Sequence, residues 1–133
     1  MKKAMISQPM RGKTEQEIRE QRERAYNALI EQGYEVIDNT CGTFKHIDTE
    51  YEFGVNVPLF RLARSLQIMA QCDAVVFCEG WREARGCNIE FRVAEAYGLQ
   101  IIEYIEGIVM DGKRLQMLMF YDGESIKEKY KTI

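Results

Sequence analysis

One stretch near the middle of the chain, Cys72 to Glu103, constrains the fold more than any other part of the sequence. It opens with the apolar run Ala74–Phe77, which is typical of a strand buried in a parallel sheet, and closes with a second such run, Leu99–Ile102. Between them, apolar residues recur at helical spacing up to Gly98: Ile89, Val93, Ala96 and Tyr97. A strand, a helix and a strand within about 30 residues predict a right-handed crossover unit.

The connection from Glu79 to Gly86 leaves the first strand of this unit at its carboxyl end. Open α/β sheets bind their ligands at that edge. Two carboxylates lie nearby in the sequence, with Asp73 at the mouth of the strand and Glu90 near the first turn of the helix. Trp81 lies in the connection itself, where its indole either stacks on a bound base or plugs the end of the sheet.

Elsewhere the chain alternates strand and helix signals. Further strands are expected over Lys3–Ser7, Tyr34–Ile37 and Leu115–Tyr121. Thr14 and Glu17 fit a capping box, which predicts a helix with Ile18, Ala25 and Leu29 facing inward and an end at Gly33. Asn56 is expected to cap another helix, whose apolar stripe covers the core or a dimer surface: Leu59, Leu62, Ala63, Leu66, Met69 and Ala70. Asp111-Gly112 signals a turn, and Ser125–Tyr130 a short final helix.

This alternation predicts a single domain over residues 1–133, an α/β three-layer sandwich with a mostly parallel sheet in the order 2-1-3-4 and an uncertain fifth strand. In that order the direction in which the chain adds strands reverses between the first and third strands, which makes this the topological switch point of the sheet. The loops that follow these two strands should therefore face each other across one crevice, which makes the crevice the expected ligand site.

The loop after the first strand carries a second signal. The segment Ser7-Gln8-Pro9-Met10-Arg11-Gly12-Lys13 leads directly into the amino terminus of a helix. Backbone N–H groups and the helix dipole favour an anion there, Gly12 permits a close approach, and Arg11 and Lys13 add positive charge. The segment predicts a phosphate site, and the alternative is a solvated turn with surface cations.

A long irregular segment, Asp38 to Val57, is typical of a lid or a binding loop. His46, Tyr51 and Phe53 within it are candidates for contact with a ligand or a partner chain, and the alternative is that His46 simply faces solvent.

Composition excludes several classes of protein. A net charge of -3 provides no electrostatic footprint for duplex nucleic acid, and no apolar run approaches the length of a membrane span. The short apolar stretch after Met1 does not fit a signal peptide, so a cytoplasmic protein is expected. Four cysteines without paired spacing and a lone histidine predict buried thiols, with no metal site, no cofactor and no disulfide framework.

The two carboxylates suggest a chemistry. Cleavage of an N-glycosidic bond with retention needs a carboxylate nucleophile beneath the anomeric carbon and a second acid near the leaving base. A helix amino terminus keeps a glutamate ionised, whereas a carboxyl at an apolar strand edge has a raised pKa. Glu90 is therefore the expected nucleophile and Asp73 the expected acid, with the two carboxyls about 5 to 6 Å apart. These roles require the strand to start earlier or to bend, because Asp73 otherwise lies at its amino end and a strand of about five residues spans roughly 17 Å. Alternatively, Glu90 only complements the helix dipole and Asp73 only ends a strand.

Three segments, ISQPMRGKT, SLQIMAQCDAVVF and GWREARGCNIEFRVAEAYG, closely resemble a family of short bacterial and phage proteins over almost the whole chain. That family is similar in turn, more distantly, to the nucleoside 2-deoxyribosyltransferases and the deoxynucleoside 5'-monophosphate N-glycosidases. The resemblance implies a flavodoxin-like or Rossmann-like fold of the deoxyribosyltransferase type and a nucleotide-like ligand.

The resemblance also extends to single positions. In those enzymes an aspartate at the start of the third strand and a glutamate after a G-x-x-x-E-like stretch do the chemistry, and Asp73 and Glu90 fall at these places. Arg11-Gly12 resembles the Arg-Gly phosphate loop of the N-glycosidases. Ala84 stands where the enzymes have a serine or aspartate, and Met5 where they often have a tyrosine. The enzymes complete their sites with residues from a neighbouring subunit, which implies a homodimer here.

Together these arguments predict a protein that binds a nucleotide or nucleoside, with hydrolysis or transfer of the N-glycosidic bond as its activity. The alternative is a catalytically silent module that senses a nucleotide and signals to a partner. The candidate catalytic residues are Glu90 and Asp73, and the candidate substrate-binding residues are Ser7, Gln8, Met10, Arg11, Gly12, Lys13, Trp81, Arg85 and Gly86.

Overall fold

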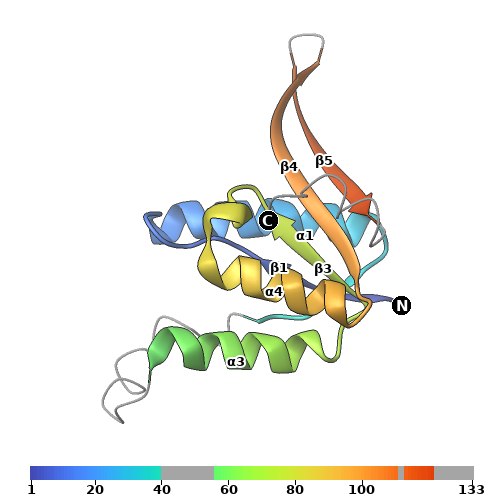
Figure 1. Cartoon of the computed structure of the whole chain (residues 1–133). Coiled ribbons are helices and arrows are strands. Elements are labelled where there is room, and N and C mark those ends of the chain that lie inside the picture. Colours follow the sequence, from blue (N-terminus) through green and yellow to red (C-terminus); the bar gives the residue numbers. More distant parts are fainter. Residues whose placement is uncertain (40–55, 111–112, 122–133) are drawn as a thin grey trace.

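The computed structural model describes residues 1–39, 56–110 and 113–121, and within them the side chains outside 107–116. The elements in chain order are β1 (Lys3–Ser7), α1 (Glu15–Glu31), β2 (Glu35–Val36), α3 (Val57–Met69), β3 (Ala74–Cys78), the 3-10 helix η1 (Trp81–Glu83), α4 (Arg85–Ala96), β4 (Gln100–Met110) and β5 (Lys113–Tyr121). Figure 1 shows these elements along the chain.

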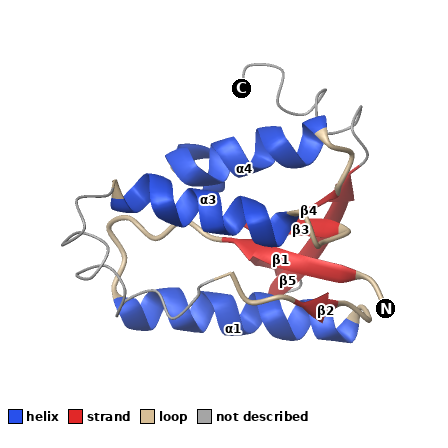
Figure 2. Cartoon of the chain, turned by 90° about the horizontal axis from the view of Figure 1, so that it is seen from below, coloured by secondary structure: helices blue, strands red, loops and turns tan. Residues whose placement is uncertain are grey.

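A five-stranded sheet in the order β2-β1-β3-β4-β5 forms the centre of the molecule. The first four strands are parallel, and β5 pairs antiparallel with β4 at the edge. Helix α1 covers one face of the sheet, while α3 and α4 cover the other (Figure 2). The predicted α/β class, the strand order and the crossover unit over β3, α4 and β4 are confirmed, and the uncertain fifth strand is an antiparallel edge strand.

Side chains alternate between the two faces of the central strands, as the twofold repeat of a strand requires. Met5 in β1 and Val75 and Phe77 in β3 pack in one core cluster with Phe91 of α4. Residues at the intervening positions, such as Ile6 and Val76, pack in a second cluster with Ala25 and Leu29 of α1: the full buried set is Ala4, Ile6, Ala25, Leu29, Ala74, Val76, Cys78, Ile102 and Tyr104. Both faces of the sheet are therefore buried from solvent, which explains the continuous apolar runs of β1 and β3.

Helix α1 begins where the sequence predicts. The Glu17 backbone N–H donates to Thr14 Oγ1 over 3.1 Å, and the Thr14 N–H donates to Glu17 Oε1 over 3.4 Å. This reciprocal pair is the predicted capping box. The predicted inward residues Ile18, Ala25 and Leu29 are buried, and Gln21 joins them.

Helix α4 presents a different face from the one predicted. The sequence places Ile89, Val93, Ala96 and Tyr97 against the sheet, yet Tyr97 is 81% exposed and Ile89 37% exposed. The buried residues are instead Cys87, Glu90, Phe91 and Ala94. Cys87, Phe91 and Ala94 are also apolar residues at helical spacing, so the sequence offers two apolar faces for this helix. Of the predicted face, Val93 is half-buried and packs against the core.

The buried face of helix α3 also differs in part from the predicted one. Asn56 caps it as predicted, since its Oδ1 accepts from the Leu59 N–H over 3.1 Å. Met69 of the predicted stripe is buried, as predicted, together with Ser65 outside the stripe, while Leu59 is 60% exposed. Of the predicted stripe, Ala63 and Ala70 are exposed, whereas Leu62 and Leu66 are half-buried. The homodimer proposed for this surface stays a prediction.

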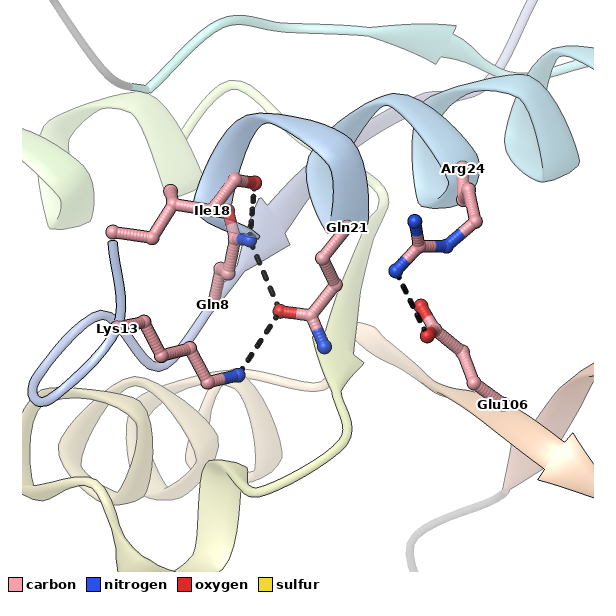
Figure 3. Close-up of polar contacts among 6 residues, drawn as sticks. All are labelled: Gln8, Lys13, Ile18, Gln21, Arg24 and Glu106. Carbon is pink, nitrogen blue, oxygen red and sulfur yellow. Dashed lines mark hydrogen bonds and ion pairs between the residues drawn. The ribbon is translucent and has the colours of Figure 1, made fainter. Parts of the chain in front are cut away.

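Strand β4 runs further than its predicted end at Ile102. It continues to Met110 because β5 pairs with it over that length, with a shift in register between Ile105 and Ile108. The two strands project beyond the rest of the sheet as a ribbon (Figure 1). Arg24 on α1 holds the base of this ribbon through an ion pair with Glu106, with 3.1 Å between Nη2 and Oε2 (Figure 3).

Several predictions fall outside the described residues. These are the candidates His46, Tyr51 and Phe53 of the long loop, the turn at Asp111-Gly112 and the final helix at Ser125–Tyr130.

We expect Thr14→Ala to lower the free energy of unfolding by about 1 kcal/mol, because it removes the hydroxyl that accepts the Glu17 N–H. Urea denaturation followed by circular dichroism measures the change. Thr14→Ser keeps the hydroxyl and is the matched control. Equal loss of stability in both variants would contradict the capping role.

Candidate functional site

The two loops that the sequence places opposite each other meet at the carboxyl ends of β1 and β3. These strands pair in register, so that Ser7 at the end of β1 lies beside Phe77 near the end of β3. Gly80 adopts a positive φ of 90°, and a Cβ added there would lie 3.5 Å from Cγ of Pro9. The loop after β1 and the loop after β3 are therefore in close contact.

A cleft of about 650 Å³ opens between these loops and the start of α3. Its lining comes from three segments: Gln8, Pro9, Met10, Arg11 and Lys13 after β1; Val57, Pro58 and Arg61 in α3; and Gly80, Glu83, Ala84, Arg85, Gly86, Cys87 and Glu90 after β3. Seven predicted site residues are thus brought together: Gln8, Met10, Arg11, Lys13, Arg85, Gly86 and Glu90.

The loop after β1 is held in place by its own hydrogen bonds. The Lys13 N–H donates to the Met10 carbonyl over 3.2 Å, which closes a turn with Gly12 at a positive φ of 79°. Gln8 is buried, and its Nε2 donates to the Ile18 carbonyl (2.7 Å) and to Gln21 Oε1 (3.0 Å) on α1 (Figure 3). Gly12, which was predicted to bind the ligand, does not line the cleft, and its positive φ shapes the turn of this loop instead.

The amino terminus of α1 differs from the predicted anion site in one respect. Thr14 and Glu17 already satisfy donors there, and Glu15 and Glu17 place negative charge in the first turn. The amino terminus of α4 has neither a side-chain cap nor acidic residues. Ala84 at its N-cap forms no side-chain hydrogen bond, and the first turn of the helix carries no acidic residue. The backbone donors of α4 consequently remain the better partners for an anion in the cleft.

Asn88 fixes the approach to that helix. Its Nδ2 donates to the carbonyls of Arg82 over 2.6 Å and Ala84 over 2.9 Å. These bonds join η1 to the first turn of α4. Arg85, the first residue of α4, places a cation at the positive end of the helix dipole, an arrangement that an anion in the cleft would stabilise.

Glu90 is the functional group of this site with the most unusual setting. It projects from the second turn of α4 and is 8% exposed. Burial raises its pKa to about 7 from the ordinary 4.5, while the Ser65 and Ser7 hydroxyls and the charge of Arg22 act in the opposite direction. The predicted effect of the helix terminus, which is to keep Glu90 ionised, is outweighed here by burial, because the dipole acts over the first turn and desolvation dominates beyond it.

A hydrogen-bonded chain of three side chains ends on this carboxyl. Arg22 Nη2 donates to Asn39 Oδ1 over 2.9 Å, and Asn39 Nδ2 lies 3.1 Å from Ser65 Oγ. The Ser65 hydroxyl lies 3.3 Å from Glu90 Oε2. These four residues also line a smaller pocket of about 160 Å³ that shares Gln8, Met10, Pro58, Arg61, Gly86 and Glu90 with the main cleft.

Ser7 lies beneath the cleft and does not line it. It is fully buried at the end of β1, and its hydroxyl lowers the pKa values of Glu90 and Cys87. Its Oγ makes no hydrogen bond of ordinary geometry to any described residue. Cys87 does line the cleft, but burial raises the pKa of its thiol to about 11, so it is not a thiolate nucleophile at neutral pH.

Asp73 lies away from the cleft. It immediately precedes β3 at the amino end of the strand, where its exposed carboxylate accepts the Lys3 backbone N–H over 2.8 Å. A five-residue strand spans roughly 17 Å, so the predicted separation of 5 to 6 Å from Glu90 is not met. Asp73 instead fastens the amino ends of β1 and β3. Glu83 is the second carboxylate that lines the cleft.

Trp81 fills the core and does not stack on a base in the cleft. It is 2% exposed, lies 4.8 Å from the Phe91 ring in a stacked arrangement and 5.1 Å from the Phe77 ring. Its Nε1 donates to Glu103 Oε2 over 3.0 Å. The alternative prediction, that the indole plugs the end of the sheet, is confirmed.

Sequence reasoning missed the contributions of Arg22, Asn39, Arg61 and Ser65. Ser65 interrupts the apolar face of α3 at a buried position, which is the one signal that marks it from sequence. The others lie on elements far apart in the chain, and only the packing of α1 and α3 brings them to Glu90.

A family model described as Domain of unknown function (DUF4406) matches residues 2–103. The chain belongs to this family. The match spans every element from β1 to the first part of β4, and so it includes both loops of the cleft and all four residues of the hydrogen-bonded chain. No curated protein matches the chain.

Other chemical features of the described residues are simple. Cys72, Cys78 and Cys87 are free and buried, which confirms the predicted thiols at these three positions. In the described ranges, no cluster of three or more His, Cys, Asp or Glu side chains could hold a metal ion. No helix in the part of the chain that the structure describes has the length and apolar character to cross a membrane.

We expect Glu90→Gln to be more stable than the wild type at pH 8, by up to about 3 kcal/mol, with little difference near pH 4.5. The folded protein holds a proton on Glu90 up to a pKa of about 7, whereas the unfolded chain releases it near 4.5. Wild-type stability therefore falls as pH rises between these values, and glutamine removes that loss. Urea denaturation at both pH values measures the difference.

The matched control is Glu83→Gln, which changes an exposed carboxylate of the same cleft and should give no such gain at pH 8. A stability difference for Glu90→Gln that stays constant from pH 4.5 to pH 8 would contradict the buried, proton-binding state of Glu90.

Proposed function

We propose that this protein binds a nucleoside monophosphate in the cleft and cleaves or transfers its N-glycosidic bond, with Glu90 as the nucleophile. The observation that carries the proposal is a buried carboxyl at the base of a cleft whose other charged lining residues are mainly cations. Those cations are Arg11, Lys13, Arg61 and Arg85, and the remaining lining carboxylate is the exposed Glu83.

The cations and the free backbone donors favour a phosphate. The uncapped amino terminus of α4 supplies N–H groups, and Arg11 and Arg85 supply exposed charge beside it. Such charge-assisted hydrogen bonds are about twice as strong as neutral ones. A phosphate bound here would leave the sugar of the same ligand within the cleft and near Glu90.

The reaction requires that Glu90 be ionised. Its carboxylate oxygen forms a bond to the anomeric carbon, and the bond from that carbon to the base nitrogen breaks with its electron pair on the base. The base takes up a proton from solvent. Attack by water on the glycosyl ester then restores Glu90, and attack by a second base gives transfer instead of hydrolysis.

A second candidate is a catalytically silent nucleotide sensor. It is favoured by the position of Asp73, because the acid expected beside Glu90 lies at the opposite end of the strand. Binding without turnover distinguishes this candidate from the enzyme.

We expect release of free base from at least one deoxynucleoside monophosphate, at a rate that rises with pH and levels off above about pH 7, because the nucleophile must lose its proton. Incubation of the purified protein with each monophosphate, followed by chromatography of the products, tests this. Glu90→Gln should lower the rate at least about 100-fold, since glutamine cannot form the glycosyl ester. Binding of monophosphates with no base released would support the sensor, and no binding at all would exclude both functions.

We expect Arg11→Ala to weaken the binding of a deoxynucleoside monophosphate by about 10-fold or more, through loss of a charge-assisted contact with the phosphate. Binding of the matching nucleoside should change little. Isothermal titration calorimetry measures both affinities. Arg92→Ala removes an exposed arginine of α4 outside the cleft lining and is the matched control. Equal weakening in the two variants would place the phosphate elsewhere.

A further inference from the structure

The directions of the hydrogen bonds that lead to Glu90 follow from the chemistry of the groups. Arginine only donates, so Asn39 must accept from Arg22 through Oδ1. The amide nitrogen of Asn39 then donates, both to the Ile6 carbonyl over 3.0 Å and to Ser65 Oγ. Ser65 Oγ accepts that bond, and its own proton is free to point at Glu90 Oε2.

We propose that Arg22, Asn39 and Ser65 are positioning residues that direct the Ser65 hydroxyl proton onto Oε2 of Glu90, and thereby favour its carboxylate form and leave Oε1 to meet the ligand. This deepens the proposed function, because it assigns the reacting oxygen and the state of the nucleophile. The arrangement of the three residues does not itself depend on any ligand.

The geometry supports a role in positioning. The hydrogen bonds from Arg22 through Asn39 and Ser65 form a relay to Glu90. Ile6 in β1 anchors this relay, since its carbonyl accepts from Asn39 and, over 3.4 Å, from Arg22. The Asn39 amide therefore has a fixed orientation, because reversing it would place its nitrogen against the Arg22 guanidinium. With that orientation fixed, Ser65 Oγ accepts from Asn39, and its proton is left to donate to Glu90 Oε2, which lies 3.3 Å away.

The relay also opposes the effect of burial on Glu90. A carboxyl that is 8% exposed is stabilised in its neutral form, and a hydrogen bond donated to Oε2 favours the ionised form. Charged or titratable groups act on Glu90 or share its two pockets from every element packed around it. They are Arg11 and Lys13 in the loop after β1, Arg22 on α1, Arg61 on α3, the carboxylate Glu83 on η1, and Arg85 and Cys87 on α4. Of these cations, Arg22 is the one linked to Glu90 through the relay of hydrogen bonds.

The test is a titration of Glu90 itself by NMR, with 13C-labelled glutamate carboxyls and Glu90→Gln to assign the signal. The wild-type midpoint should lie near pH 7. In Ser65→Ala it should rise by about one pH unit, because the ionised form loses a donated hydrogen bond. Asn39→Ala should move it in the same direction, because the Ser65 proton is then no longer directed at Oε2. Ser65→Thr keeps the hydroxyl and should restore the wild-type midpoint.

Gln67→Ala, an exposed change on the same helix, is the control for general effects on α3. An unchanged midpoint in both Ser65→Ala and Asn39→Ala would overturn the relay. The readout needs no nucleotide, so the two proposals fail separately. A shifted midpoint without base release would support the relay and contradict the glycosidase, whereas base release without a shifted midpoint would contradict the relay alone.

Discussion

The parallel pairing of β1 with β3 is the constraint on which the rest of the structure depends. Its register, from Ala4 beside Ala74 to Ser7 beside Phe77, ends the two strands at the same level. Both connections therefore leave the sheet together, and the contact of Pro9 with Gly80 joins them. The cleft, its cations and the amino terminus of α4 all follow from this alignment.

The pairing also explains why the two ends of the sheet present different groups. At the amino ends, Asp73 accepts the Lys3 N–H and serves the sheet itself. At the carboxyl ends, the same backbone direction presents loops and helix termini with donors still available. Two carboxylates that are only 17 residues apart in sequence consequently lie at opposite ends of the sheet.

The packing of α4 buries the Glu90 carboxyl, and this burial has a cost in stability. The helix buries Cys87, Glu90, Phe91 and Ala94 against the sheet and α3, and a charged form of Glu90 is disfavoured there. Surrounding groups offset part of that cost through the Ser65 hydroxyl, the Ser7 hydroxyl and the charge of Arg22. A carboxyl that is readily protonated near neutral pH is typical of functional sites, and this setting is the physical basis of the proposals made for it.

The sequence by itself determined the α/β class, the order of the strands, the capped starts of α1 and α3, and the meeting of the two loops. Each of these depends on local patterns: apolar runs, capping residues and the handedness of crossovers. Only the tertiary structure decided which face of α4 is buried, where Trp81 lies, and that Arg22, Asn39 and Ser65 lead to Glu90. The sequence already put Asp73 at the amino end of its strand, and the structure decided that no bend brings it to the cleft. These features depend on contacts between residues far apart in the chain, and on desolvation that no local pattern records. For α4 in particular, both the Ile89 face and the face with Cys87, Phe91 and Ala94 carry apolar residues at helical spacing, and only packing in the folded chain decided between them.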